Sequence, residues 1–351
     1  MTASSWRLSD ARFLLILLLP GLTLLNLLEH PGSVFWWAAG TFIVIAVVDT
    51  WWPGAQRSPP PVGRQPWLPW LLRLYVPLQL ALLVAGLAAA PHSSWLELAG
   101  MAFAVGFVTG AQGITFAHEL GHSRSRSDRA LAWTLMTSVN YSHFMVEHYR
   151  GHHVRAATRD DPASARRGES LWRFLPRTLA GCFVDGWLLE AKQLKRTGRT
   201  WLASPLAWCW ALNLAFVLTL AATGSTKMLA FWLGQSTFAI LLLEAVNYVE
   251  HYGLQRAVSA DGKREPFGVG HAWNADHVLS NSVLANLQRH SDHHMHAWTP
   301  YPELQALPGP QLPTGYSGCV LLAAVPPLWF AVMDRRLATA AAAPAADPAR
   351  G

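Results

Sequence analysis

The sequence predicts an all-α, polytopic membrane protein with about six transmembrane helices and a histidine-rich helical cap on the cytoplasmic side. Of its 351 residues, 52% are hydrophobic and only 14% are charged, whereas a soluble protein usually carries about 25% charged residues. Eighteen tryptophans are typical of a chain with many residues at the membrane interface. Several apolar stretches also approach the roughly 20 residues that a helix needs to cross a bilayer.

Six apolar stretches are long enough, or nearly so, to span a bilayer: 13–29, 33–52, 70–90, 96–117, 203–222 and 228–248. Pro20 and Gly21 predict a kink in the first of them. The apolar segment 130–146 is expected to form a helix on the membrane surface. The segment 315–333, interrupted by Pro326 and Pro327, is expected to be interfacial or re-entrant.

We therefore expect a single membrane domain over residues 1–335. Its cap would be formed by the polar regions 118–202 and 249–312. The remaining residues, 336–351, are rich in alanine and proline, a composition that predicts a disordered tail.

The basic residues are unevenly distributed along the chain, whose net charge is +6. They crowd the stretch from Arg124 to Arg199, whereas the loops on the opposite side of the predicted membrane offer only Lys227. Because positive residues favour the cytoplasmic side, the N-terminus and both long polar regions are expected in the cytoplasm. Histidine clusters interrupt the basic stretch, so we interpret it as a cytoplasmic loop and not as a nucleic-acid-binding surface.

Three cysteines, Cys182, Cys209 and Cys319, lie far apart and form no Cys-x-x-Cys pair. Their odd number argues against a disulfide framework. The chain also lacks the cysteine pairs that a thiolate-bound iron centre of its own would need.

Nine of the fifteen histidines form four short clusters beside the ends of predicted spans, all on the expected cytoplasmic side. Within a helix, residues four apart share one face. On this rule His148 and His152 would lie together, with His153 about 100° further round the helix. The nine are His118, His122, His148, His152, His153, His251, His290, His293 and His294.

Imidazole is the commonest neutral metal ligand near pH 7, and nine imidazoles are too many for one ion. The sequence therefore predicts a polynuclear, nitrogen-rich metal site. A site with few anionic ligands favours a redox metal with an open position for dioxygen, and spacing alone does not choose iron over copper.

Three other interpretations explain less of the pattern. The motif His118-Glu-Leu-Gly-His122 matches that of zinc proteases, but such a site would leave seven clustered histidines unused. A haem protein would place its axial histidines within facing spans and not at their ends. A histidine-rich metal transporter would need polar groups along the spans, which are nearly free of them.

Polar side chains near the histidines are expected to hold the metal-bound imidazoles in place, because such rings usually donate their other N–H to a neighbouring acceptor. Glu244 is notable because it lies within a predicted span, where an ionised acid costs roughly 2–3 kcal/mol. A ligand imidazole is its expected partner. The full set is Glu119, Glu147, Glu244, Asn247, Glu250, Asp276 and Asp292.

The motifs resemble those of the integral-membrane alkane monooxygenase family, a branch of the membrane desaturase and hydroxylase group. The likeness runs from about residue 95 to residue 335. It is carried by EHYRGHHVRAATRDDPASARRGES at 147–170, NYVEHYGL at 247–254, LQRHSDHH at 287–294 and LPTGYSG at 312–318. Ser123, Asp276 and Met295 depart from the usual pattern, and none of these changes removes a histidine.

The resemblance implies that the nine histidines bind two iron ions in a bacterial cytoplasmic membrane, with the site on the cytoplasmic side. It implies terminal hydroxylation of n-alkanes with O2, and electrons from a separate rubredoxin that is supplied by rubredoxin reductase. The absence of cysteine pairs agrees with a separate electron donor. An aromatic-methyl hydroxylase and a fatty-acyl desaturase remain the alternatives on the same scaffold.

Two further hypotheses concern substrate and partner. Thr41 and Ile45 share a face of the second span, and a slim Thr41 would leave a deep tunnel that admits medium-to-long alkanes. Arg150, Arg155, Arg166 and Arg167 would dock an acidic rubredoxin.

Overall fold

The computed structural model describes residues 8–52, 59–61 and 65–342, and these residues form helices and loops without a β-strand. Six helical segments are long and apolar enough to cross a membrane, which confirms the six predicted spans. Their bounds are Asp10–Glu29, Pro31–Trp51, Leu68–His92, Trp95–His122, Pro205–Ala222 and Thr226–His251.

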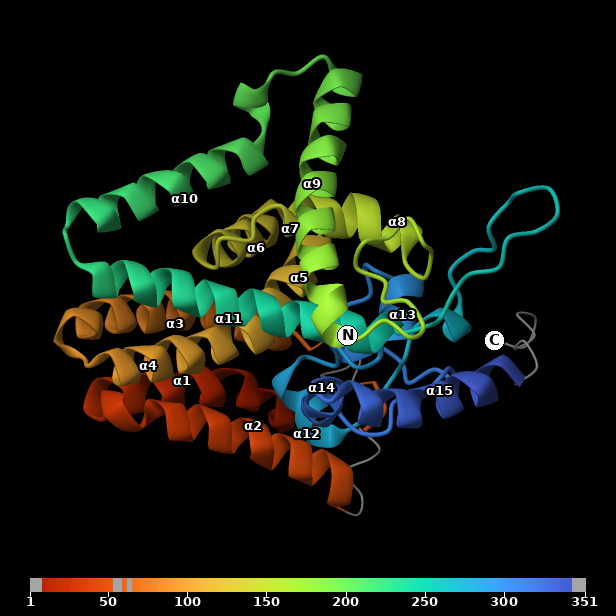
Figure 1. Cartoon of the computed structure of the whole chain (residues 1–351), viewed down its shortest axis with the longest axis horizontal. Coiled ribbons are helices and arrows are strands. Elements are labelled where there is room, and N and C mark those ends of the chain that lie inside the picture. The colour runs from red at the N-terminus through yellow and green to blue at the C-terminus, as the bar shows by residue number, and fades with distance from the viewer. Residues whose placement is uncertain (1–7, 53–58, 62–64, 343–351) are drawn as a thin grey trace.

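Five of the spans lie side by side, as Figure 1 shows. They contain helices α1 (Leu15–Glu29), α2 (Val34–Trp51), α3 (Leu68–Ala89), α4 (Trp95–Val108) and α11 (Thr226–His251). Helix α4 lies at the centre of the bundle, where it packs against both α2 and α11. The sixth span, α10 (Pro205–Ala222), diverges from the other five.

The fourth span is not a uniform α-helix. After α4 it widens into a π-helix, η4 (Thr109–Ile114), before it continues as α5 (Thr115–His122). Small residues let this span approach α11 closely: a Cβ on Gly110 would lie 2.7 Å from the Cα of Ala239, and one on Gly106 would lie 2.7 Å from the carbonyl oxygen of Gln235. Such close approach is the usual means by which membrane helices associate.

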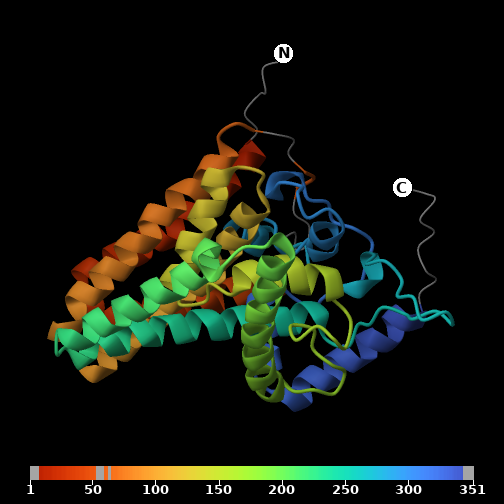
Figure 2. The ribbon, with the colours of Figure 1, turned by 90° about the horizontal axis from the view of Figure 1, so that it is seen from above.

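The cap contains short helices that carry the histidines and longer helices that support them. The histidine-bearing elements are α5, η5 (His148–His152), α8 (His153–Arg155), the end of α11, and α13 (His290–Met295). The others are α6 (Arg126–Ser138), α7 (Phe144–Glu147), α9 (Leu171–Thr197), α12 (Val278–Val283), α14 (Tyr316–Ala323) and α15 (Pro326–Ala342). Figure 2 shows the cap gathered at one end of the bundle.

Buried amide side chains tie the spans to the cap. The Gln79 side chain donates to the Ser138 hydroxyl at 2.8 Å, and Gln235 donates to the Ser138 carbonyl at 3.2 Å. Gln112 donates to the carbonyl of Val283 at 3.0 Å. Polar groups within a span need such partners because lipid offers none, and these residues join the spans to the cap through them.

The structure corrects three local predictions. The helix expected over 130–146 is α6, and it ends at Ser138 because Asn140 adopts a left-handed backbone conformation with φ 55°. The segment 315–333 forms two helices that meet before Pro326, where proline is well suited to begin a helix. The tail expected to be disordered from residue 336 is helical to Ala342, and Leu337 is buried against Gly253. Residues 343–351 lie outside the described residues.

Helix α9, which has 27 residues, was not predicted. Its buried positions follow a helical spacing, but the many arginines and lysines of this region conceal that pattern. The helix supports the histidine-bearing elements through contacts with Glu244 and Arg150.

We predict that Gly110→Ala lowers the thermal stability of the purified protein, although alanine is intrinsically a better helix former than glycine by about 1 kcal/mol. The added methyl group would collide with the backbone of α11, and overpacking of this kind costs about 1–3 kcal/mol. Gly40→Ala is the matched control, because a Cβ there meets no atom within 4 Å. Equal melting temperatures for the two variants in the same detergent would contradict the close-approach argument.

Candidate metal centre

All nine clustered histidines lie at one end of the helical bundle. They arrive from four segments far apart in the sequence and form two groups, within each of which the candidate ligand nitrogens lie within 4.8 Å of one another. The first group is His118, His122, His148, His153 and His293. The second is His152, His251, His290 and His294.

In the first group, three imidazoles surround His153. Its Nε2 atom lies 3.1 Å from Nε2 of His122, 3.0 Å from Nε2 of His148 and 3.3 Å from Nε2 of His293. One neutral ring nitrogen cannot form hydrogen bonds with three others at once. The convergence is therefore better explained by a shared ligand than by hydrogen bonding.

The second group has the same arrangement. Nε2 of His290 lies 3.2 Å from Nε2 of His251 and 3.0 Å from Nε2 of His294. The fourth member, His152, directs its ring toward those of His251 and His294, with ring centroids 4.8 Å and 4.9 Å away.

The backbone decides how the second histidine cluster is divided between the two groups. His148–His152 is a π-helical turn, in which hydrogen bonds close over five residues instead of four. His148 therefore lies over His153, and both join the first group, while His152 turns to the second. His148 and His152 are still neighbours, with ring centroids 5.1 Å apart, but the π-helical turn places their ligand nitrogens in different groups. The other pairs spaced four residues apart stay together: His118 and His122 are both in the first group, and His290 and His294 are both in the second.

The residues fit metal ions well. Two nitrogens bound at about 2.1 Å to one ion, at right angles, would lie about 3 Å apart, which is the separation seen in both groups. The Nε2 atoms of His118 and His152 are buried and have no hydrogen-bond partner. An unpaired buried acceptor is costly, and a bound cation would remove that cost.

The protonation state of the histidines also favours metal binding. Burial lowers the pKa of His148 well below its usual value, and the neighbouring rings of His118 and His153 lower it further. Burial also lowers the pKa values of the cap histidines His153, His290, His293 and His294 well below the usual range. These rings are therefore neutral near pH 7, which is the form that binds metals.

Two carboxylates contact the histidines directly. Glu250, which was predicted, lies 3.3 Å from Nδ1 of His290 and accepts a hydrogen bond from the Tyr316 hydroxyl at 2.6 Å. Asp161, which was not predicted, lies 2.9 Å from Nδ1 of His152 and accepts from the Ser164 hydroxyl at 2.6 Å. Burial would raise the pKa of Asp161, but its interactions with His152 and with the Ser164 hydroxyl hold it below its usual value.

Asp161 was missed because it lies eight residues beyond the histidine cluster, in a loop whose path local spacing does not define. Its only signal is the Asp160-Asp161-Pro162 sequence within the downstream part of that motif.

The other predicted supporting residues contact different partners. Glu244 accepts hydrogen bonds from Tyr141, Thr178 and Asn247, and not from an imidazole. The packing of α9 supplies Thr178, which is why the sequence did not reveal this partner. Glu119 accepts a hydrogen bond from the Tyr301 amide, and Glu147 forms an ion pair with Arg155. Asp276 accepts from Arg289 and Asn281. Asp292 contacts His296 and accepts from the Gln305 amide.

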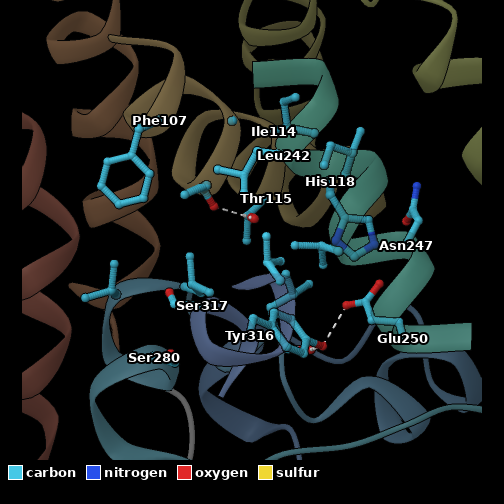
Figure 3. A pocket seen from close by; sticks show the side chains of 18 of the residues that line it. Phe107, Ile114, Thr115, His118, Leu242, Asn247, Glu250, Ser280, Tyr316 and Ser317 are labelled. Carbon is cyan, nitrogen blue, oxygen red and sulfur yellow. Dashed lines mark hydrogen bonds between the residues drawn. The ribbon is translucent and has the colours of Figure 1, made fainter. Parts of the chain in front are cut away.

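An apolar cavity borders both histidine groups, and Figure 3 shows it from close by. At one end lie His118 and His148 of the first group, with His290 of the second and Glu250. The rest of the wall is mostly aliphatic or aromatic and comes from the spans and from α12 and α14. It includes Leu19, Phe42, Ile45, Phe107, Ile114, Leu242, Leu243, Val246, Val283 and Val320.

Of the two predicted tunnel residues, only Ile45 lines this cavity. Thr41 is not part of the wall, and its hydroxyl is bonded to the Trp37 carbonyl of its own helix at 2.8 Å. The face of α2 that borders the cavity passes through Phe42 and Ile45, three residues apart, and Thr41 lies one position before Phe42.

The four predicted docking arginines differ in their surroundings. Arg150 pairs with Glu190 at 2.7 Å, and Arg155 pairs with Asp185, so both are engaged within the cap. Arg166 and Arg167 are exposed, and together with Arg159 and Gln255 they line a surface hollow.

The chain was compared with known proteins. A family model described as fatty acid desaturase matches residues 93–317. Alkane 1-monooxygenase 2 of Pseudomonas aeruginosa is 38% identical over 340 residues, which cover 90% of each chain. Alkane 1-monooxygenase 1 of the same organism is 43% identical over 246 residues, which are 69% of this chain but only 64% of that relative. The xylene/toluene monooxygenase hydroxylase component of Pseudomonas putida is 27% identical over 317 residues, 87% of this chain and 83% of that protein.

The matched region contains all four histidine clusters and most of the cavity wall. On the strength of the family model and of relatives that align along nearly its whole length, this chain belongs to the fatty acid desaturase family, in the group of the alkane 1-monooxygenases.

Proposed function

We propose that this chain is a rubredoxin-dependent alkane 1-monooxygenase of the bacterial cytoplasmic membrane, with its site on the cytoplasmic side. It would convert the terminal methyl group of a medium-to-long n-alkane into a primary alcohol. One atom of O2 enters the C–H bond, and the other leaves as water with two electrons and two protons. The observation that carries this proposal is an apolar cavity bordered by two groups of imidazoles.

Two iron ions, one held by each histidine group, would supply the activation of dioxygen. The five histidines of the first group and the four of the second leave no carboxylate among the candidate ligands. Asp161 and Glu250 would orient His152 and His290 through their Nδ1 atoms, so that Nε2 of each ring points to the centre of its group.

The cavity walls would bind and orient the substrate. An alkane has no hydrogen-bonding group, so its affinity must come from burial, at about 0.8 kcal/mol per CH2 group. Because His118, His148 and His290 border one end of an otherwise apolar space, only a chain end would reach the reacting position. The same apolar walls would keep bulk water away from the site.

The electron donor would dock on the hollow formed by Arg159, Arg166, Arg167 and Gln255. Arg167 packs against Gly253, two residues after His251, so this surface lies close to the second histidine group. A cationic surface suits an acidic rubredoxin, and the association would weaken as salt increases.

The relatives favour an alkane substrate over an aromatic methyl group. Proteins named alkane 1-monooxygenase are 34–43% identical to this chain, whereas the xylene/toluene enzyme is 27% identical. No feature of the cavity favours a fatty-acyl desaturase or a metal transporter.

The purified protein should contain about two iron ions per chain and oxidise octane or hexadecane to the 1-alkanol when rubredoxin and its reductase are added. His118→Ala and His294→Ala each remove one ligand, from the first and second group respectively, and should lower the iron content and abolish product formation. His30→Ala is the control, because His30 lies outside both groups. A protein that binds only zinc, or that keeps full activity in either ligand variant, would refute the proposal.

Asp161→Asn should reduce turnover and iron retention by about 10–100-fold, because His152 would lose the carboxylate that fixes its orientation. The neighbouring substitution Asp160→Asn is the matched control: Asp160 is exposed and pairs only with Arg264 among the described residues. Iron content and alcohol formation measured on both variants would test this role. Equal effects of the two substitutions would argue against it.

Ile45→Trp should shorten the longest alkane that the enzyme accepts, because the larger side chain would fill part of the cavity. Thr41→Trp, on the same helix but outside the cavity wall, should leave the product profile unchanged. The measurement is the rate of alcohol formation for alkanes of increasing length. A larger change with the Thr41 variant would show that the substrate does not occupy this cavity.

A further inference from the structure

Helix α9 carries an exposed apolar stripe that runs along most of its length. Residues four apart on a helix are neighbours, offset by about 40°. Five exposed residues follow one another at this spacing and form a stripe that winds gradually round the helix: Trp172, Pro176, Ala180, Val184 and Leu188. Val184 is 54% exposed and Leu188 is 62% exposed. A continuous apolar surface of this kind requires an apolar partner.

The opposite face of α9 is fixed against the metal-bearing part of the cap. The Thr178 hydroxyl donates to Glu244 of α11 at 2.7 Å, and Glu190 pairs with Arg150 of η5 at 2.7 Å. Gly186 lies against His143, where an added Cβ would be only 3.1 Å from the His143 side chain. At each of these levels the exposed stripe therefore lies on the side of α9 away from the metal-bearing part of the cap.

Basic residues continue the stripe toward the C-terminal end of the helix. Lys192 and Arg196 follow Leu188 at the same spacing of four residues, and Lys195 and Arg199 lie nearby. All four are exposed, and none of them forms an ion pair within the described part of the chain. They form a free cationic patch next to an apolar surface.

The chain then enters the membrane directly. Trp201 and Leu202 are exposed, at 46% and 77%, just before span α10 begins at Pro205. The outer side of α10 is also apolar and exposed, with Trp208 at 59% and Leu212 at 62%. The stripe on α9 is thus continuous with a surface that faces lipid.

We propose that α9 lies in the plane of the cytoplasmic membrane surface and binds anionic phospholipids. Its apolar stripe would enter the outer part of the acyl chains. Lys192, Lys195, Arg196 and Arg199 would contact lipid phosphates, with their aliphatic stems along the membrane surface. Both views of the ribbon agree with this placement, because α9 crosses the direction of the spans near the level at which the cap begins (Figures 1 and 2).

A second copy of the chain could also cover an apolar stripe, but the structure favours lipid. A protein interface core is depleted of lysine, whereas tryptophan combined with a cationic patch is the usual composition of a helix at an anionic membrane surface. Continuity with the lipid-facing side of α10 supports the same conclusion.

The lipid preference can be measured by native mass spectrometry of the purified holoenzyme with an equimolar mixture of phosphatidylglycerol and phosphatidylcholine. The wild-type protein should retain phosphatidylglycerol selectively, and Lys195→Gln/Arg196→Gln should weaken that selectivity by at least about tenfold. Lys263→Gln/Arg264→Gln is the control with the same change in charge, in the loop that projects away from the spans (Figure 1). Equal selectivity in the two double variants would overturn the cationic part of the proposal.

The apolar stripe needs a separate test. In a Cys209→Ser background, where the remaining cysteines Cys182 and Cys319 are buried, an environment-sensitive fluorophore would be attached at Leu188→Cys or at Lys263→Cys. In lipid nanodiscs the probe at position 188 should emit at a shorter wavelength than the probe at 263. Identical spectra, or an oligomer that dissociates on Leu188→Glu substitution, would show that lipid does not cover this face. Neither measurement depends on catalytic activity.

Discussion

Nine imidazoles gathered in two close groups at one end of the bundle impose the main constraint on this structure. Ring nitrogens such as Nε2 of His118 and His152 are buried without hydrogen-bond partners, an arrangement that costs free energy in the absence of a cation. Contacts elsewhere in the molecule must therefore offset this free-energy cost and keep the four histidine-bearing segments together. Asp161 is bonded to the His152 ring and Glu250 lies beside the His290 ring, while Gln79, Gln112 and Gln235 anchor the cap to the spans.

The spans give this site its chemical environment. Close packing of α4 and α11 through Gly106 and Gly110 brings His118 and His251 to the same end of the bundle. Helices α2, α12 and α14 complete an apolar cavity that reaches the histidines. A substrate without polar groups can be bound only by such a surface, so in the proposed enzyme the membrane-spanning part of the chain would also bind the substrate.

Helix α9 connects the metal site to the periphery of the molecule. One face supplies Thr178 and Glu190 to the segments beside the histidines, and the other face is apolar and exposed. The proposed lipid contact and the support of the segment 148–153 therefore lie on two sides of the same helix.

Local sequence patterns were sufficient for the six spans and for the nine histidines, because apolar length and short-range spacing are properties of a continuous stretch. They also indicated Glu250, which directly precedes His251. Only the tertiary structure decided that His153 joins His148 while His152 faces the other group, since a π-helical turn changes the register without any marker in the spacing. Likewise, Asp161 reaches His152 through the path of a loop, and Ile45 rather than Thr41 borders the cavity through the rotation of α2 against its neighbours. These features depend on contacts between distant segments, which the order of residues along one segment does not specify.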